Sequence, residues 1–236
     1  MGYDKNFGNY DYNSSESALS VTINKVYGWM ALALGVSAFA AYYTATSEAL
    51  LNLIFGNSFG MWGLIIAEFV LVIAMSAGMN KFSFSTLALL FGVYSVLNGM
   101  TLSVILLVYT MSSIVTAFVS TAATFGVMSL IGYTTKKNLA SYGSYFLMAL
   151  IGLVIASLVN MFLHNSMMDL IITYIGLFIF VGLTAYDTQK IKNQLQMGES
   201  YGVDTRKIGL MGAFNLYLDF INLFLYILRL LGSRRN

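Results

Sequence analysis

Three acidic side chains lie within or at the edge of long apolar stretches, where an ionised carboxylate is costly. They are Glu68, Asp187 and Asp219, and no Lys or Arg lies within the body of these stretches. A charged carboxylate at the centre of a bilayer costs several kcal/mol. Such a group must hold a proton, share one with a second carboxylate, or face water and cations. These residues therefore favour the binding of protons or metal cations rather than of anions.

The three carboxylates differ in depth and so in the role that each suggests. Asp219 lies near the middle of its apolar segment, where an aspartate without a function is uncommon. Asp187 lies at the end of its segment beside Lys190 and Lys192, so a simple interfacial charge is an equally good interpretation. Glu68 is equally compatible with a protonated structural acid that bonds to another helix. A functional role is therefore best supported for Asp219.

A polar stripe runs along the segment that contains Asp219. Asn215, Asp219 and Asn222 are spaced four and three residues apart, which places them on one face of a helix. A helix with this stripe is better placed at the centre of a bundle than against lipid. We therefore expect a central seventh helix in which the two asparagines support the aspartate.

The composition requires that lipid surrounds most of the chain. Of its 236 residues, 58% are hydrophobic and only 9% are charged, whereas a soluble domain carries about 25% charged residues. A helix that crosses a bilayer needs roughly 20 apolar residues. The segments that qualify are 26–46, 59–77, 87–109, 114–133, 143–163, 170–187 and 208–231. The sequence therefore predicts an all-α membrane protein, a seven-helix transmembrane bundle with the seventh helix central.

The remaining segments complete the domain organisation. Residues 1–25 are polar and are predicted to form a loosely ordered cytoplasmic tail, followed by a transmembrane domain at 26–231 and a basic tail at 232–236. Only residues 110–113 separate the third and fourth spans, which predicts a tight helical hairpin.

The distribution of basic residues predicts the orientation in the membrane. They gather before the first span and in the connections after the second, fourth and sixth spans: Lys5, Lys25, Lys81, Lys136, Lys137, Lys190, Lys192, Arg206 and Lys207. Positively charged loops stay in the cytoplasm, so the N-terminus is predicted to be cytoplasmic. Seven crossings would place Arg229, Arg234 and Arg235 outside, against the same rule. Either a full crossing or a seventh segment that dips in and returns is compatible with this pattern.

Several classes of function are disfavoured by what the chain does not contain. It has no Cys, and its 12 basic residues nearly balance its 10 acidic ones, so we expect neither thiolate chemistry nor nucleic-acid binding. No hydrolase or phosphate-loop motif is present, so we expect no enzymatic activity. The one histidine, His164, lies near the outer end of the fifth span and is more typical of an interfacial residue than of a metal ligand.

Three segments of the chain resemble the Bax inhibitor-1 family, whose members carry the transmembrane Bax-inhibitor motif. Residues 183–191, Leu-Thr-Ala-Tyr-Asp-Thr-Gln-Lys-Ile, are similar to the Tyr-Asp-x-x-x-Ile end of that family's sixth span. Residues 215–224, Asn-Leu-Tyr-Leu-Asp-Phe-Ile-Asn-Leu-Phe, resemble its most characteristic motif, in the seventh span. Residues 135–139, Thr-Lys-Lys-Asn-Leu, are similar to its basic loop between spans four and five. The position of Glu68 is also acidic in bacterial relatives, and the resemblance extends over about 25–231.

The resemblance implies a fold, a site and several functions. Six helices would surround a central seventh in a monomer of a bacterial-type inner membrane. Bacterial members include pH-sensitive calcium-leak proteins, in which two aspartates of the sixth and seventh helices approach each other on the cytoplasmic side of the pore. By motif match these are Asp187 and Asp219. Other members restrain a membrane-bound quality-control protease or protect eukaryotic cells from death signals.

One position departs from the pattern of these relatives. Some of them carry an Arg near the cytoplasmic end of the second span, which latches onto the aspartate pair. Met79 stands at that position here, and Lys81 is two residues displaced and lacks the planar fork of Arg. We therefore expect no arginine latch.

These observations lead to one working hypothesis and two alternatives. Two carboxylates forced together cannot easily both ionise, so Asp187 and Asp219 would share a proton, and its loss at higher pH would separate the two helices. The pair would be a proton sensor and a candidate calcium site, although calcium usually takes six to eight ligands. The alternatives are a regulator of another membrane protein, such as a protease, with the N-terminal tail as its handle, and proton-coupled transport of a small solute.

The depths of the two aspartates place a condition on this hypothesis. At about 1.5 Å per residue, Asp219 lies near mid-membrane and Asp187 roughly 10 Å nearer the cytoplasm. The pair can meet only if the seventh helix is shifted inward or is shorter than the predicted span.

Overall fold

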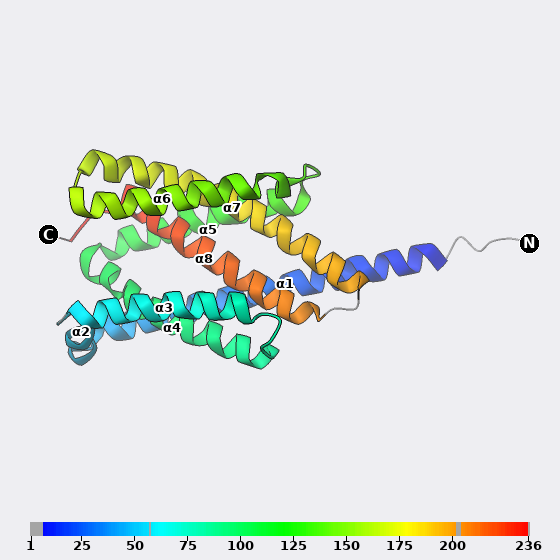
Figure 1. Cartoon of the computed structure of the whole chain (residues 1–236), viewed down its shortest axis with the longest axis horizontal. Helices are drawn as coiled ribbons and strands as arrows, with labels where there is room; N and C mark the ends of the chain where they lie inside the picture. The colour runs from blue at the N-terminus through cyan, green and yellow to red at the C-terminus, as the bar shows by residue number, and fades with distance from the viewer. Residues whose placement is uncertain (1–6, 57, 202–203, 236) are drawn as a thin grey trace, which may run out of the picture.

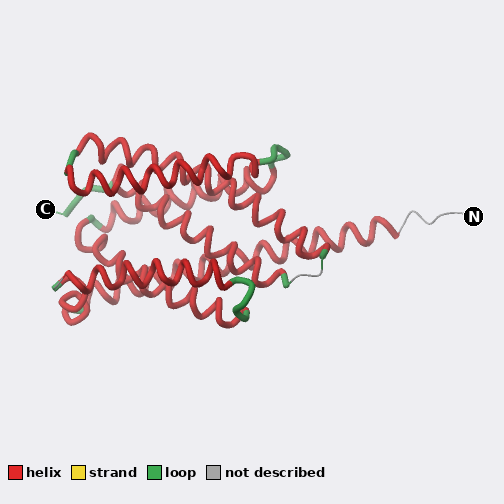
Figure 2. The backbone as a smooth tube through the Cα atoms, viewed as in Figure 1, coloured by secondary structure: helices red, strands yellow, loops and turns green. Residues whose placement is uncertain are grey.

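The fold is a bundle of long helices, seen in a computed structural model that describes residues 7–56, 58–201 and 204–235 (Figures 1 and 2). Its elements in chain order are α1 (Phe7–Thr46), α2 (Glu48–Phe55), α3 (Ser58–Gly78), α4 (Phe84–Val108), α5 (Met111–Thr134), the 3₁₀ turn η1 (Leu139–Tyr142), α6 (Gly143–Leu163), α7 (Ser166–Ser200) and α8 (Thr205–Leu231). Seven of these helices are long and apolar enough to cross a membrane, which confirms the predicted number of spans. The short helix α2, capped by Ser47, is additional.

Two of the spanning helices, α1 and α7, are much longer than the sequence predicted. Helix α1 begins at Phe7, so residues 7–25 of the predicted tail are helical, and Leu19 and Ile23 are buried in the core. Residues 1–6 of that tail lie outside the described residues. Helix α7 continues to Ser200, so Asp187 is an interior residue of a helix and does not mark its end.

The spanning helices form two groups with α8 between them. Helices α1 to α4 form the first group, in which α4 packs along α1 and α3. Helices α5 to α7 form the second, in which α7 packs against α5 and α6. Figure 1 shows α8 running obliquely between the two groups, and it contacts α1 and α4 on one side and α5 and α7 on the other. The predicted central position of the seventh helix is confirmed.

The expectation of a tight hairpin between the third and fourth spans is wrong. Only Tyr109 and Thr110 separate α4 from α5, yet these two helices share few contacts because each packs within its own group. Close approach within the groups occurs at glycines. A Cβ at Gly99 would meet the backbone of α1 at Ser37, and a Cβ at Gly132 would meet the backbone of α7 at Ala185.

The C-terminal segment shows that α8 crosses the whole bundle. Beyond α8, the backbone amide of Arg235 donates to the carbonyl of Val108 at 2.8 Å, and the amide of Thr110 donates to the carbonyl of Ser233 at 3.1 Å. These bonds attach the C-terminal segment to the connection between α4 and α5. Between a full crossing and a segment that returns, the structure therefore selects the full crossing.

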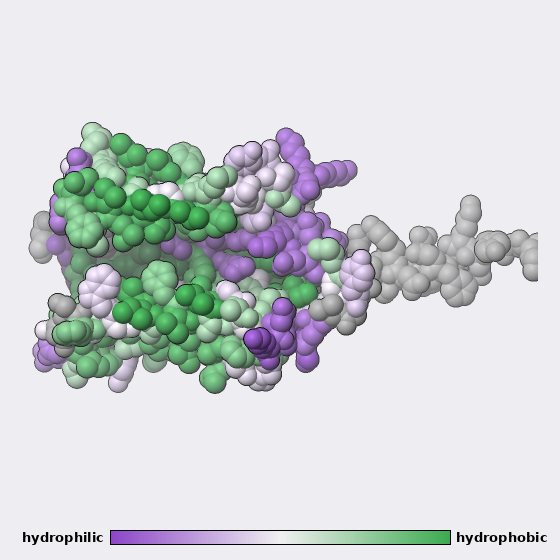
Figure 3. Space-filling model, in the orientation of Figure 1, coloured by the Kyte–Doolittle hydropathy of each residue, from purple (hydrophilic) through white to green (hydrophobic). Residues whose placement is uncertain are grey.

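The surface and the core are those expected of a bundle in lipid. Figure 3 shows apolar side chains over the flanks of the visible face, with hydrophilic residues gathered toward one end. Helix α8 has the most buried of the spanning segments, and its rings Phe214 and Tyr217 pack edge-on against Phe91 and Tyr94 of α4. The central helix is therefore held by aromatic packing on the side of the first group.

Candidate functional site

The two aspartates of the predicted site meet where α7 packs against α8. The carboxyl groups of Asp187 and Asp219 lie within hydrogen-bonding reach of each other, and each lies in the electrostatic field of the other. Because α7 continues for three further turns beyond Asp187, this residue lies deeper in the bundle than the end of a span would place it. The pair meets although α8 is not shorter than the predicted span, because α7 is longer than predicted.

The surroundings of Asp219 leave its charge poorly compensated. Its side chain is 4% exposed. Apart from the facing carboxyl group of Asp187, no donor among the described residues reaches its buried Oδ2. Asp187 is only half-buried. A buried carboxylate without donors is unfavourable when ionised, because neither water nor N–H groups replace its lost hydration. The pair can hold one proton between its oxygens far more easily than it can hold two charges.

One basic side chain, that of Lys190, lies near the pair. Lys190 follows Asp187 by three residues, and its positive charge attracts both carboxyl groups. Its Nζ lies 5.8 Å from the centre of the Tyr186 ring and is exposed. The ion pairs found among the described residues are Arg206–Asp204 and Arg229–Asp169, so Lys190 acts at longer range.

Met79, at the position where some relatives carry the latch arginine, is partly buried and packs against the hydrophobic core of this chain. Lys81 is exposed in the turn that follows α3. Lys190 on α7 is the cation nearest in sequence to the pair.

The two asparagines of the polar stripe differ from the aspartate between them. Asn222 donates from Nδ2 to the carbonyl of Leu218, one turn earlier in α8, at 2.8 Å. Asn215 is half-buried. Neither residue shields Oδ2 of Asp219. Their supporting role stays a prediction.

Glu68 lies in a second polar cluster, on the side of α8 that faces the first group. Thr101 donates to its Oε1 at 2.6 Å, and the Asn98 amide donates to its Oε2 at 3.2 Å. The hydroxyl of Tyr217 donates to Oδ1 of Asn98 at 2.9 Å. The chain of bonds then reaches Ser37, whose Oγ lies 2.7 Å from the Tyr217 oxygen. Four helices, α3, α4, α8 and α1, are joined by this network.

The sequence pattern did not predict the network around Glu68. Asn98 and Thr101 lie three residues apart in one apolar segment and Ser37 lies in another, and such polar residues are common in spanning helices. Asn98 was the best available signal, because an amide near the middle of a span needs partners when it is buried. Its partners come from two other helices, which spacing along one segment does not reveal.

A further acidic residue, Asp204, lies outside the spans, and its carboxylate is paired with hydrogen-bond donors. Asp204 is the N-cap of α8 and accepts hydrogen bonds from the backbone and side chain of Arg206 at 3.1 and 3.0 Å. The side-chain hydrogen bond lowers the pKa of Asp204 below its ordinary value. This exposed carboxylate is a useful contrast with Asp219, because its donors favour the charged form.

These features define a class of protein: a seven-helix integral membrane protein in which a buried carboxyl group of the central helix faces a carboxyl group of the preceding helix. The chain belongs to the Bax inhibitor family, since residues 19–236 match the family described as inhibitor of apoptosis-promoting Bax1. It is 50% identical to the inner membrane protein YbhL of Escherichia coli (strain K12) over 225 residues, which cover 93% of this chain and 94% of that protein. It is also 46% identical to a Borreliella burgdorferi protein over 212 residues, 90% of this chain and 91% of that one. A Rickettsia prowazekii protein is 44% identical over 212 residues, 90% of this chain and 89% of its own.

Proposed function

We propose that the chain is an inner-membrane protein that lets cations leak across the bilayer under the control of pH, with Asp187 and Asp219 as the proton-sensing gate. The observation that supports this most directly is the facing carboxyl pair, in which Oδ2 of Asp219 is buried without another donor. Similarity to the inner membrane protein YbhL supports the location. The basic connections support a cytoplasmic N-terminus.

The gate follows from the electrostatics of the pair. With one shared proton, the two carboxyl groups attract each other through a hydrogen bond and hold α7 against α8. When the proton leaves, two negative charges face each other in a poorly hydrated space and repel. The closed arrangement is then disfavoured, α7 and α8 separate, and water and a cation can enter.

Calcium fits this site as a permeating ion rather than as a stored one. Carboxylate oxygens are the ligands that a hard divalent cation prefers. Among the described residues, no group of three or more His, Cys, Asp or Glu side chains comes together. Two carboxylates provide fewer ligands than a tight calcium site needs. Such a pair would attract a cation and release it again.

Calcium flux into liposomes tests the proposal. Reconstituted wild-type protein should pass more calcium as the pH is raised from about 6 to about 8, because deprotonation of the pair opens the gate. Asp219→Asn, which cannot lose the shared proton, should give a flux with little dependence on pH. The matched control is Asp204→Asn, which neutralises an exposed carboxylate elsewhere on α8 and should leave the pH dependence intact. The same flux from wild type, Asp219→Asn and empty liposomes at every pH would contradict the proposal.

A further inference from the structure

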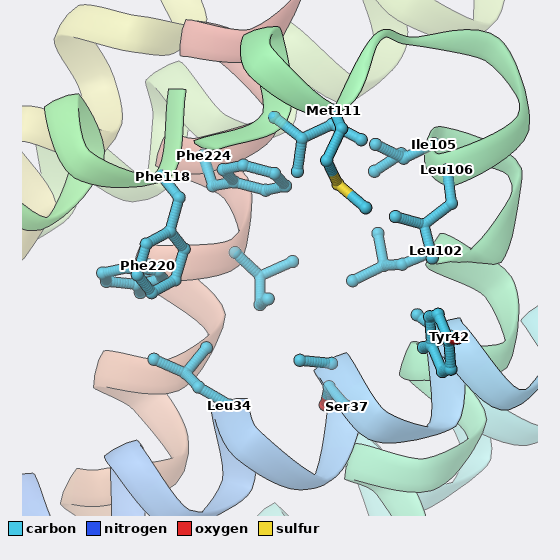
Figure 4. A pocket seen from close by; sticks show the side chains of 14 residues that line it. Leu34, Ser37, Tyr42, Leu102, Ile105, Leu106, Met111, Phe118, Phe220 and Phe224 are labelled. Atoms are coloured by element: carbon cyan, nitrogen blue, oxygen red, sulfur yellow. The ribbon is translucent and has the colours of Figure 1, made fainter. Parts of the chain in front are cut away.

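An apolar cavity of about 290 Å³ lies between α1, α4, α5 and α8, on the side of the central helix away from the carboxyl pair. Figure 4 shows Leu102 and Leu106 of α4 facing Phe220 and Phe224 of α8 across it. Its one buried polar side chain, Ser37, is already bonded to the carbonyl of Ser95 and to Tyr217. The wall of the cavity is therefore apolar, and the hydroxyl of Ser37 is already used in other hydrogen bonds.

The cavity is open to the lipid phase. It forms where α4 and α5 diverge from their short connection, so its walls come from helices that have few contacts with each other. Three lining side chains are strongly exposed at the surface of the bundle: Tyr42 by 59%, Met111 by 61% and Phe118 by 48%. A hydrocarbon chain can therefore enter sideways from the bilayer. The space is too small for a partner helix, which is about 10 Å across.

The guanidinium of Arg235 lies at the end of the cavity nearest the C-terminal segment. Arg235 is held there by the bond from its backbone amide to the carbonyl of Val108, and its Nη1 reaches the carbonyl of Leu106, a lining residue, at 3.4 Å. The neighbouring Arg234 lines a different, more polar cavity with Asp169 and Arg229. This difference is expected, because successive side chains of an extended segment point to opposite sides.

We infer that this cavity binds one acyl chain of an anionic phospholipid, whose phosphate is held by Arg235. An apolar slot that opens into lipid, with a guanidinium at the level of the membrane surface, matches the two parts of such a molecule. Arginine is well suited to phosphate because its fork presents several donors to the phosphate oxygens. Asp169, which lines a cavity with Arg234, is already paired with Arg229 at 3.6 Å. The inference does not depend on cation leak.

Lipid retention measured by native mass spectrometry tests this inference. The detergent-solubilised full chain is titrated with dioleoyl phosphatidylglycerol or with dioleoyl phosphatidylcholine. Wild type should retain one phosphatidylglycerol more tightly than phosphatidylcholine. Arg235→Gln should weaken phosphatidylglycerol binding about fivefold, the effect of one basic residue near an anionic lipid. It should weaken phosphatidylcholine binding less, because the choline of that lipid offsets the charge of its phosphate. Arg234→Gln, the matched control, should behave as wild type.

A second pair of variants tests the cavity itself. Ala38→Phe places a ring in the cavity and should reduce retention of both lipids, whereas Ala149→Phe, on an exposed part of α6, should not. Equal effects of Arg234→Gln and Arg235→Gln would overturn the inference. So would full lipid retention by Ala38→Phe, or displacement of the lipid by glycerol phosphate, which has a headgroup but no chains.

Discussion

The acidic side chains on the two sides of α8 have opposite surroundings. On the side of the first group, Glu68 receives hydrogen bonds from Thr101 and Asn98 within a network that continues to Tyr217. On the side of the second group, Asp219 faces another carboxyl group, and no further donor reaches its Oδ2 among the described residues. Tyr217 and Asp219 are two residues apart, which places them about 200° apart around the helix.

This contrast separates a structural acid from one that suits a switch. A carboxyl group with donors keeps its surroundings whether or not a proton is present, because the donors fix its position. A carboxyl group whose main neighbour is a second carboxyl group depends entirely on the proton between them. We therefore expect the network around Glu68 to stabilise one side of α8, and the pair at Asp219 to leave the other side able to move in the proposed gate. We expect α7, rather than α1 or α4, to be the helix that separates from α8.

The largest expected effect on stability comes from breaking the Glu68 network at its centre. Asn98 is 8% exposed and links Glu68 to Tyr217. Asn98→Leu removes the donor to Glu68 Oε2 and the acceptor of the Tyr217 hydroxyl, and should lower the free energy of unfolding by about 2–3 kcal/mol. Unfolding of the detergent-solubilised protein by SDS measures the change.

The control for this variant is a half-buried amide that bonds within its own helix. Asn222 bonds only to the carbonyl of Leu218 in its own helix. Asn222→Leu should therefore cost about 1 kcal/mol or less. If the two variants were equally stable, the network would not be what holds α8 to the first group.

The contrast between the two sides was only partly predictable from the sequence. The spacing of Asn215, Asp219 and Asn222 correctly predicted a central α8, because a polar stripe is tolerated only inside a bundle. The meeting of Asp187 with Asp219 was implied by family resemblance, and the condition on their depths disappeared only when α7 proved to continue to Ser200. Helix length beyond an apolar segment is poorly marked, since polar residues can continue a helix out of the membrane.

The arrangement of the two helix groups could not be predicted from local sequence. The short connection predicted at residues 110–113 suggested a hairpin, but a short connection does not fix the angle between helices. That angle is set by distant partners: the close approach at Gly99 to α1 and at Gly132 to α7. The C-terminal segment, bonded at Val108 and Thr110, then occupies the junction. Each of these contacts joins residues far apart in the chain.

A smaller effect should come from Glu68→Gln, which sharpens the comparison directly. The amide keeps one acceptor and the overall shape, so the network should survive with a loss of about 1 kcal/mol. Calcium flux in liposomes should keep its dependence on pH, in contrast to Asp219→Asn, because the charge of Glu68 does not operate the gate. A flux that no longer responded to pH in Glu68→Gln would show that both sides of α8 take part in sensing.

The smallest expected effect concerns Lys190, whose charge acts on the pair from an exposed position. Its positive charge favours the ionised form of both carboxyl groups, so Lys190→Gln should make loss of the shared proton harder. The midpoint of the flux should move to higher pH by about half a unit, since exposed charges interact weakly.

Lys192→Gln is the matched control, because the Nζ of Lys192 bonds to the Tyr133 carbonyl at 2.9 Å and not to the carboxyl pair. Raising the salt concentration should shrink the difference between wild type and Lys190→Gln. A shift of the midpoint to lower pH would mean that Lys190 holds the gate closed by binding the ionised pair, which would make it the functional equivalent of the missing arginine latch.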